Sequence, residues 1–196
     1  MQPQPTDYTD LSVIIAALRG PHTRGQIANC PDVPFGDPGL FARELWPGAD
    51  RVAGRIGIVP HHSMLRNART RALLAGLGDT KLLDMTSPDI AGTMRQLSEC
   101  SLIVSSSLHG LIFADAYGIP SLFWNEQGTE NEWKYRDYFD GVGRPDFVGL
   151  PAAEILALVQ NGGTDGMPVS VLAEADCVQT LSDLRAAAAL IPGGTA

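Results

Sequence analysis

The chain has 196 residues, of which 44% are hydrophobic and 18% charged, and its formal net charge is −8. That composition is too apolar for a disordered chain, and the length suits a domain with a sizeable buried core. The 22 acidic against 14 basic side chains, with no run of Lys or Arg, argue against a nucleic-acid surface. No apolar stretch approaches the ~18 residues of a spanning helix, and the first residues lack a signal-peptide pattern. We therefore expect a cytoplasmic protein without a transmembrane segment.

Short apolar runs alternate with longer amphipathic segments along the chain. The apolar runs predict strands at Ser12–Leu18, Arg55–Pro60, Lys81–Met85, Leu102–Ser105 and Pro120–Trp124. These runs are continuously apolar rather than alternating, which is typical of strands that are covered by helices on both faces.

Helices are predicted between and after these strands. They are expected within Ser63–Leu77, from Ser87 or Asp89 to about Cys100, and over Leu108–Tyr117, Trp133–Phe139, Ala152–Gln160 and Leu181–Leu190. Strands that recur regularly with a helix between them specify right-handed crossovers and a parallel sheet. The predicted fold class is therefore α/β, a Rossmann-like parallel sheet with helices on both faces.

Three regions follow from this reading of the chain. Residues 1–10 are polar and Pro-rich and are expected to be flexible. Residues 11–160 are expected to form the Rossmann-like domain. Residues 161–196 are expected to form a flexible break at Asn161–Asp165, a linker and a closing helix.

Polar side chains follow the strands at the points where each strand ends. They include His61, His62, Ser106, Ser107, His109, Asn125 and Glu126. In an open parallel sheet, ligands bind beyond the carboxyl ends of the strands, where loops and helix N-termini gather. Three of the four histidines are in this set, so we expect a ligand site at this edge of the sheet.

The turn Ser105-Ser106-Ser107-Leu108-His109-Gly110 offers hydroxyls and backbone N–H groups where an anion would lie. His109, in the first turn of the following helix, can add a proton or a positive charge. The alternative is that the serines only cap the helix and His109 packs against the sheet. The chain has no G-x-S-x-G elbow, phosphate-loop or G-x-G-x-x-G pattern, which disfavours a serine hydrolase and the common nucleotide folds.

Metal binding is not indicated. His61 and His62 are adjacent, so in extended backbone their side chains point in opposite directions. Cys30, Cys100 and Cys177 are far apart and have no C-x-x-C spacing, which predicts neither a zinc site nor a disulfide framework.

Two further segments combine charges with a predicted helix. Pro21 suits the first position of a helix, which puts Arg19 at or just before its start and places Arg19 and Arg24 near the sheet edge. The alternative is a solvated helix start. The segment Trp133–Tyr138 mixes aromatic rings with both charges, as a lid, an interface helix or a half-buried surface helix would.

Taken in order, these motifs carry a family resemblance. They are Arg19-Gly20-Pro21-x-Thr23-Arg24, Gly36-Asp37-Pro38, Ile58-Val59-Pro60-His61-His62, and Ser105-Ser106-Ser107-Leu108-His109-Gly110 continuing through Ala116-Tyr117-Gly118-Ile119-Pro120. Over about residues 18 to 140 the chain resembles the polysaccharide pyruvyl transferase family. The later Trp133-Lys134-x-Arg136-Asp137-Tyr138 is similar to members that act on exopolysaccharides.

The resemblance implies a GT-B-like architecture and transfer of an enolpyruvyl group from phosphoenolpyruvate to a sugar of a surface polysaccharide or its precursor. It implies that His109 acts as general acid toward the donor and that arginines hold the donor's anionic groups. The expected substrate-binding residues are Arg19, Arg24, His61, His62, Ser106, Ser107, Gly110, Asn125 and Glu126. Many members have Arg where this chain has Ser107, so one anion contact differs. No metal or organic cofactor is required.

Family enzymes carry a further α/β domain before the Arg-Gly-Pro segment. By resemblance the chain is therefore the C-terminal, donor-side half, and we expect the acceptor half on a longer chain, on a separate partner or in a homo-oligomer. One alternative is a glycosyltransferase-type half-domain that binds a sugar nucleotide, with Glu126 as its ribose-binding carboxylate. Another is a non-catalytic remnant that serves as a binding or interaction domain.

Overall fold

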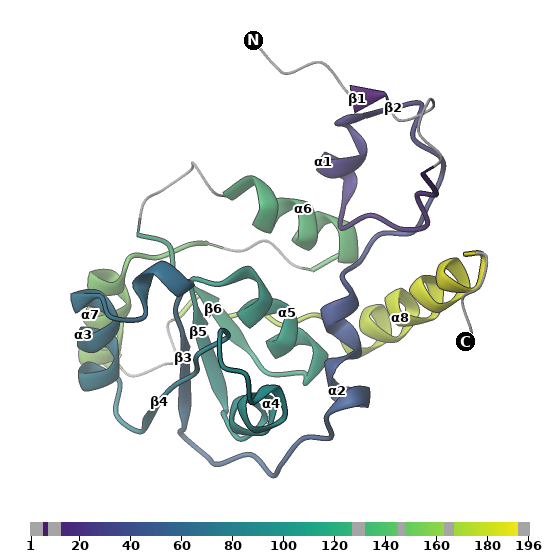
Figure 1. Cartoon of the computed structure of the whole chain (residues 1–196). Helices are drawn as coiled ribbons and strands as arrows, with labels where there is room; N and C mark the ends of the chain where they lie inside the picture. The colour runs from purple at the N-terminus through teal and green to yellow at the C-terminus, as the bar shows by residue number, and fades with distance from the viewer. Residues whose placement is uncertain (1–5, 8–12, 127–131, 145–147, 163–166, 192–196) are drawn as a thin grey trace. The chain divides into compact units, whose positions relative to one another are not determined.

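The computed structural model describes residues 6–7, 13–126, 132–144, 148–162 and 167–191 (Figure 1). The chain divides into two compact units. The first unit comprises residues 1–38, 131–144 and 172–196, and the second comprises residues 39–130 and 145–171. Most of the N-terminal stretch expected to be flexible, and residues 163–165 of the expected break, lie outside the described residues.

The second unit contains a four-stranded parallel sheet with the strand order β4-β3-β5-β6. Its strands are β3 (Ile56–Val59), β4 (Thr80–Leu82), β5 (Leu102–Ser105) and β6 (Ser121–Phe123). They confirm four of the five predicted strands and their parallel direction. Every residue of β3 and β5 is buried, which explains why these runs are continuously apolar.

Helices cover both faces of this sheet, as Figure 1 shows. On one face lie α3 (Ala68–Gly76) and α7 (Ala152–Gly162), and on the other lie α4 (Ile90–Ser98) and α5 (Leu108–Ala116). The chain steps from β3 to β4 in one direction and then back past β3 to β5. Right-handed connections therefore place α3 and α4 on opposite faces. The α/β, Rossmann-like fold is confirmed.

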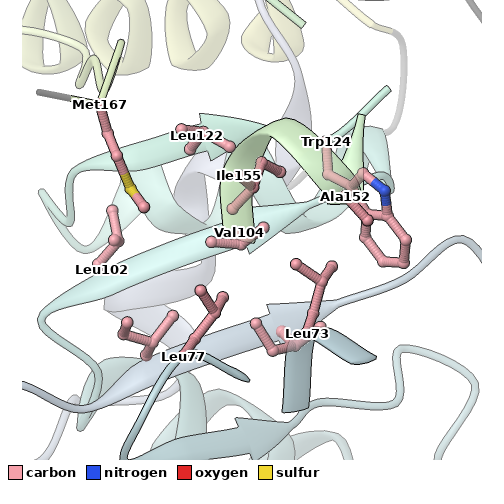
Figure 2. Close-up of a cluster of buried hydrophobic side chains, with 11 residues drawn as sticks. Leu73, Leu77, Leu102, Val104, Leu122, Trp124, Ala152, Ile155 and Met167 are labelled. Carbon is pink, nitrogen blue, oxygen red and sulfur yellow. The ribbon is translucent and has the colours of Figure 1, made fainter. Parts of the chain in front are cut away.

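The core beneath α3 and α7 is drawn in Figure 2. Leu73 and Leu77 are four residues apart and so lie on one side of α3, facing Val104 of the sheet and Ile155 of α7. Leu73, Val104 and Ile155 are fully buried. Burial of one such side chain contributes about 1.5–3 kcal/mol, so this layer fixes α3 and α7 against the strands.

Local signals set the helix ends where the sequence predicts them. Asp89 is the N-cap of α4, and its Oδ1 accepts a hydrogen bond from the N–H of Gly92 at 2.9 Å. Ser87, the other candidate cap, accepts the N–H of Asp89 instead. After α5 the chain turns at Gly118, whose φ of 61° suits a residue without a Cβ.

The first unit is built around α6 (Glu132–Val142), which contacts both α1 (Pro21–Arg24) and α8 (Glu174–Ala189). The short strands β1 (Thr6–Asp7) and β2 (Ile27–Ala28) pair in parallel. Elsewhere a short helix α2 spans Ala42–Leu45, and 3₁₀ turns span Pro38–Phe41 (η1) and His62–Met64 (η2). None of the helices in the described part of the chain is long and apolar enough to cross a membrane.

The predicted first strand, Ser12–Leu18, is wrong. Residues 13–17 form no strand, and Val13 and Ile14 are 54% and 60% exposed. The N–H of Leu18 donates to the carbonyl of Pro34, and the N–H of Gly36 donates to the carbonyl of Leu18. β-branched residues favour extended backbone, but a strand also needs a neighbouring segment whose backbone N–H groups can donate to it. Pro34 has no backbone N–H to donate.

Candidate active site

The strand order reverses between β3 and β5, which makes the space beyond their carboxyl ends the switch point of the sheet. From β3 the chain continues through α3 to β4, whereas from β5 it continues through α5 to β6 on the other side. The two strands are in register up to Val59 and Ser105, so they end side by side. Ligands of open α/β sheets bind at such a point because the diverging connections leave a crevice.

A hydrogen bond joins the loops that follow these two strands. The backbone N–H of His61 donates to Oγ of Ser106 at 2.9 Å, and the N–H of Ser106 donates to the carbonyl of Val59 at 3.0 Å. Ser106 is 8% exposed, so its hydroxyl is a fixed part of the fold. The structure therefore brings together His61 and Ser106, which lie far apart in the sequence.

The two adjacent histidines pack against each other. Their ring centroids are 4.1 Å apart with an interplanar angle of 45°. Nδ1 of His61 lies 2.9 Å from Oγ of Ser63, while His62 is exposed. His61 is thus held by the loop, and His62 is open to solvent.

Ser105, which the sequence prediction left out of the binding set, organises the turn into α5. Its Oγ accepts the N–H of Ser107 at 3.0 Å and lies within donor distance of the carbonyls of Ser107 (2.8 Å) and Val59 (3.1 Å). A Cβ on Gly110 would collide with Ser105 Oγ and with the side chain of Val59. Gly110 is therefore needed for the close approach of α5 to β3 and β5. The sequence signal that could have identified Ser105 was a serine at the last position of a strand that is predicted to be buried.

The N-terminus of α5 lies just beyond the end of β5, at this switch point. Ser107 is the N-cap, but its side chain makes no capping hydrogen bond. Within the described part of the chain, the N–H groups of Leu108, His109 and Gly110 have no acceptor. Unpaired N–H groups and the helix dipole favour an anion at such an end.

His109 lies in the first turn of α5, is exposed, and stacks on Phe113 at 5.9 Å between ring centroids. No hydrogen bond to its imidazole is formed by any residue that the structure describes. Its ring nitrogens are therefore available to a ligand. The alternative in which His109 packs against the sheet does not hold.

Glu126 is held by three protein donors. Its Oε1 accepts from Nε1 of Trp124 at 2.6 Å and from the N–H of Ala152, the first residue of α7, at 2.8 Å. Its Oε2 lies 2.8 Å from Nε of Arg69 on α3. The carboxylate is 11% exposed, so it joins β6, α7 and α3. The neighbouring N–H of Asn125 donates to the carbonyl of Leu150 at 2.9 Å.

Asp84, beyond the end of β4, is a further carboxylate at this edge that sequence reasoning missed. Hydrogen bonds from the Thr86 hydroxyl and then from the Thr86 backbone N–H hold the pKa of Asp84 below its ordinary value. The carboxylate therefore stays ionised at neutral pH. The sequence signal that could have identified Asp84 was the position of a carboxylate at the end of a predicted strand.

Arg19 and Arg24 belong to the first unit, whereas His109 belongs to the second. Arg19 lies just before α1, as predicted, and its Nε is 3.2 Å from Oδ2 of Asp137 on α6. The fully buried Asp137 carboxylate also accepts from the N–H and hydroxyl of Thr23. Arg24 Nη1 lies 3.0 Å from Oδ1 of Asp32 on the surface.

The sheet and its edge thus define a Rossmann-like domain with polar side chains gathered at its switch point. Residues 37–125 match the family model described as polysaccharide pyruvyl transferase. That segment contains β3 to β6 and the residues described above at their ends, up to and including Asn125. Over these residues, which make up less than half of the chain, the chain is similar to the polysaccharide pyruvyl transferase family.

Two curated proteins are similar to the chain. The succinoglycan biosynthesis protein ExoV of Rhizobium meliloti (strain 1021) is 26% identical over 133 residues, covering 66% of this chain and 40% of that protein. The uncharacterized protein L143 of Acanthamoeba polyphaga mimivirus is 31% identical over 137 residues, covering 64% of this chain and 47% of that protein. The matched parts are therefore less than half of each relative. No solved structure matches the chain.

Proposed function

We propose that the chain binds phosphoenolpyruvate at the β3–β5 crevice and takes part in transfer of its pyruvyl group to a saccharide. The observation that carries the proposal is the N-terminus of α5, where three unpaired N–H groups and the free imidazole of His109 adjoin the joined loops of His61 and Ser106. Phosphoenolpyruvate carries a phosphate and a carboxylate on a small frame, and both suit donors of this kind.

The reaction requires one proton to be delivered to carbon. His109 protonates the methylene carbon of the donor, which leaves C2 with cationic character. A sugar hydroxyl attacks C2 and a second hydroxyl displaces the phosphate, giving a ketal. Of the two hydroxyl protons, one restores the proton that His109 gave and the other leaves on the departing hydrogen phosphate. A histidine suits this transfer because its ordinary pKa lies near neutrality, and such catalysis is worth about 10²–10⁴-fold in rate.

The other expected binding residues have distinct roles in this proposal. Ser106 and His61 shape the wall of the crevice, His62 and Ser107 face the donor, and Gly110 lets the helix end approach it. Arg19 and Arg24 each keep N–H groups beyond the bond to a carboxylate, and their expected contact with the donor stays a prediction. Donor and acceptor need no metal or organic cofactor for this chemistry.

Glu126 favours the pyruvyl transfer proposal over binding of a sugar nucleotide. A ribose-binding carboxylate needs free oxygen lone pairs that can accept from sugar hydroxyls. Both oxygens of Glu126 already accept from protein donors, and the group is nearly buried. Its contacts support a structural role between α3 and α7.

Calorimetric titration of phosphoenolpyruvate into the whole chain at pH 7 tests the proposal. Wild type should bind, and His109→Ala should weaken binding by about 10- to 100-fold, the effect of losing a hydrogen bond to a charged group. Arg95→Ala is the matched control, because Arg95 is 74% exposed in the last turn of α4. Absence of heat at millimolar ligand, or equal loss in the control, would refute the donor site. A sugar nucleotide titrated in parallel tests the alternative.

A further inference from the structure

An exposed indole on the first unit is surrounded by fixed polar side chains. Trp133, in the first turn of α6, is 45% exposed. The guanidinium carbon of Arg19 lies 5.9 Å from its ring centroid. The ring of His22, on α1, lies 6.3 Å from the indole at an interplanar angle of 57°. We call Trp133, Arg19, His22 and Asp140 the Trp133 face.

The polar members of the Trp133 face are held in place by contacts of their own. Nε2 of His22 lies 2.7 Å from Oδ2 of Asp140. Arg19 Nε is anchored on the buried carboxylate of Asp137, and within the described residues no acceptor is bonded to its Nη1 and Nη2 groups. Little side-chain freedom would therefore be lost when a ligand meets these groups.

This combination matches the chemistry of a sugar ring. A pyranose presents an apolar C–H face that can lie on an aromatic plane, and hydroxyls at its rim that need donors and acceptors. Arg19 supplies planar N–H donors, and the carboxylate of Asp140 supplies an acceptor. An exposed indole without such a rim would instead suit a purely apolar partner.

The local charge favours an anionic sugar. Lys134 follows Trp133, and burial together with the charge of Arg19 lowers the pKa of its ammonium. The Nη1 and Nη2 groups of Arg19, which have no acceptor among the described residues, can pair with a negative group on the sugar. A carboxylate or phosphate on the sugar ring supplies that group.

We propose that the Trp133 face binds a negatively charged pyranose, stacked on the indole, as part of the saccharide acceptor. The assignment to the acceptor rests on the proposed function, whereas the binding itself does not. The site needs no residue of the second unit.

The test uses the indole N–H signals of the whole chain in ¹H–¹⁵N NMR spectra. Methyl β-D-glucuronide, methyl β-D-glucoside and acetate are titrated separately, and phosphoenolpyruvate is titrated into a parallel sample. We expect the glucuronide to shift the Trp133 signal saturably and the glucoside to bind more weakly. The signal of Trp124 should stay unchanged because that side chain is fully buried.

Variants assign the binding to the Trp133 face. Trp133→Ala should abolish glucuronide binding, Trp133→Phe should keep part of it, and His22→Ala should weaken it about 3- to 10-fold, the loss of one polar contact. Trp46→Phe is the matched control and should bind normally. The dispersion of the spectra shows that each variant is folded.

Two outcomes overturn the inference: an equal response to acetate alone, or unchanged glucuronide binding by the folded Trp133→Ala variant. If phosphoenolpyruvate binds and the glucuronide does not, the inference fails and the proposed function stands. If the glucuronide binds and phosphoenolpyruvate does not, the proposed function fails and the saccharide site stands.

Discussion

The backbone N–H of His61 donates to the hydroxyl oxygen of Ser106 across the switch point of the sheet, at 2.9 Å. The two residues follow neighbouring strands whose connections leave in opposite directions. This one bond therefore fixes the spacing of the two loops that shape the proposed donor site. It also makes the hydroxyl of Ser106 unavailable as a freely rotating ligand group.

Removal of that hydroxyl should destabilise the second unit. Ser106→Ala leaves the His61 N–H without its acceptor, and we expect a loss of about 1–2 kcal/mol in the free energy of unfolding. Ser107→Ala is the control. Although Ser107 is the N-cap of α5, its side chain makes no capping bond, so its loss should change stability by less than about 0.5 kcal/mol. Urea unfolding of both variants measures the difference, and equal losses would contradict it.

Gly110 and His109 are neighbours that should respond to substitution in opposite ways. Gly110→Ala forces a Cβ into Ser105 and Val59, and we expect a cost of about 1–3 kcal/mol from overpacking. His109→Ala should leave the unfolding midpoint nearly unchanged, because its ring is exposed, while weakening binding of phosphoenolpyruvate to the proposed donor site. Gly25→Ala is the control for the first variant, since a Cβ there meets only ordinary contacts at 3.6 Å. A stable Gly110→Ala protein would show that α5 can shift away from the strands.

Glu126 should prove structural, with its two oxygens differing in importance. Glu126→Ala removes the acceptor of the buried Trp124 indole and of the Ala152 N–H, so we expect a loss of about 2–4 kcal/mol. Glu126→Gln keeps that acceptor and loses mainly the pairing with Arg69. Because Arg69 is 58% exposed, that pair contributes about 1 kcal/mol or less. Thermal or urea unfolding should rank the two variants in this order, and Arg69→Ala should resemble Glu126→Gln.

Alkaline pH should weaken the second unit through Cys100. Burial raises the pKa of the Cys100 thiol from 9.0 to about 11. The native state thus holds this proton more tightly than the unfolded chain, and the associated stability is complete below pH 9 and is lost as the pH rises toward 11. Cys100→Ala should flatten the fall in unfolding free energy over that window, whereas Cys30→Ala should not. An identical slope in both variants would contradict the burial argument.

The same burial pattern predicts which thiols react. Cys30 is half-buried, while Cys100 and Cys177 are buried. A thiol reagent added to the native chain at neutral pH should therefore label Cys30 first, and the other two only upon unfolding. Mass spectrometry of the labelled peptides identifies the site. Fast labelling of Cys100 would show that the core between β3 and α4 opens readily.

The sequence by itself determined the elements whose information is local. The continuous apolar runs of β3 and β5, the cap at Asp89 and the turn at Gly118 all lie where their residue types predict, because each depends on neighbours within a few positions. It also predicted that His61, Ser106 and His109 share one edge, since parallel strands end on the same side of a sheet.

Only the tertiary structure decided the features that depend on distant partners. The strand order β4-β3-β5-β6, and with it the switch point, follows from packing that no local pattern encodes. Residues 13–17 have the composition of a strand but pair with no strand among the residues that the structure describes. Glu126 is predicted as a ligand residue from its strand-end position, and only the tertiary structure shows that its oxygens contact Arg69 and Ala152. Side-chain chemistry sets what a residue can bind, whereas the fold sets which of its partners are already within reach.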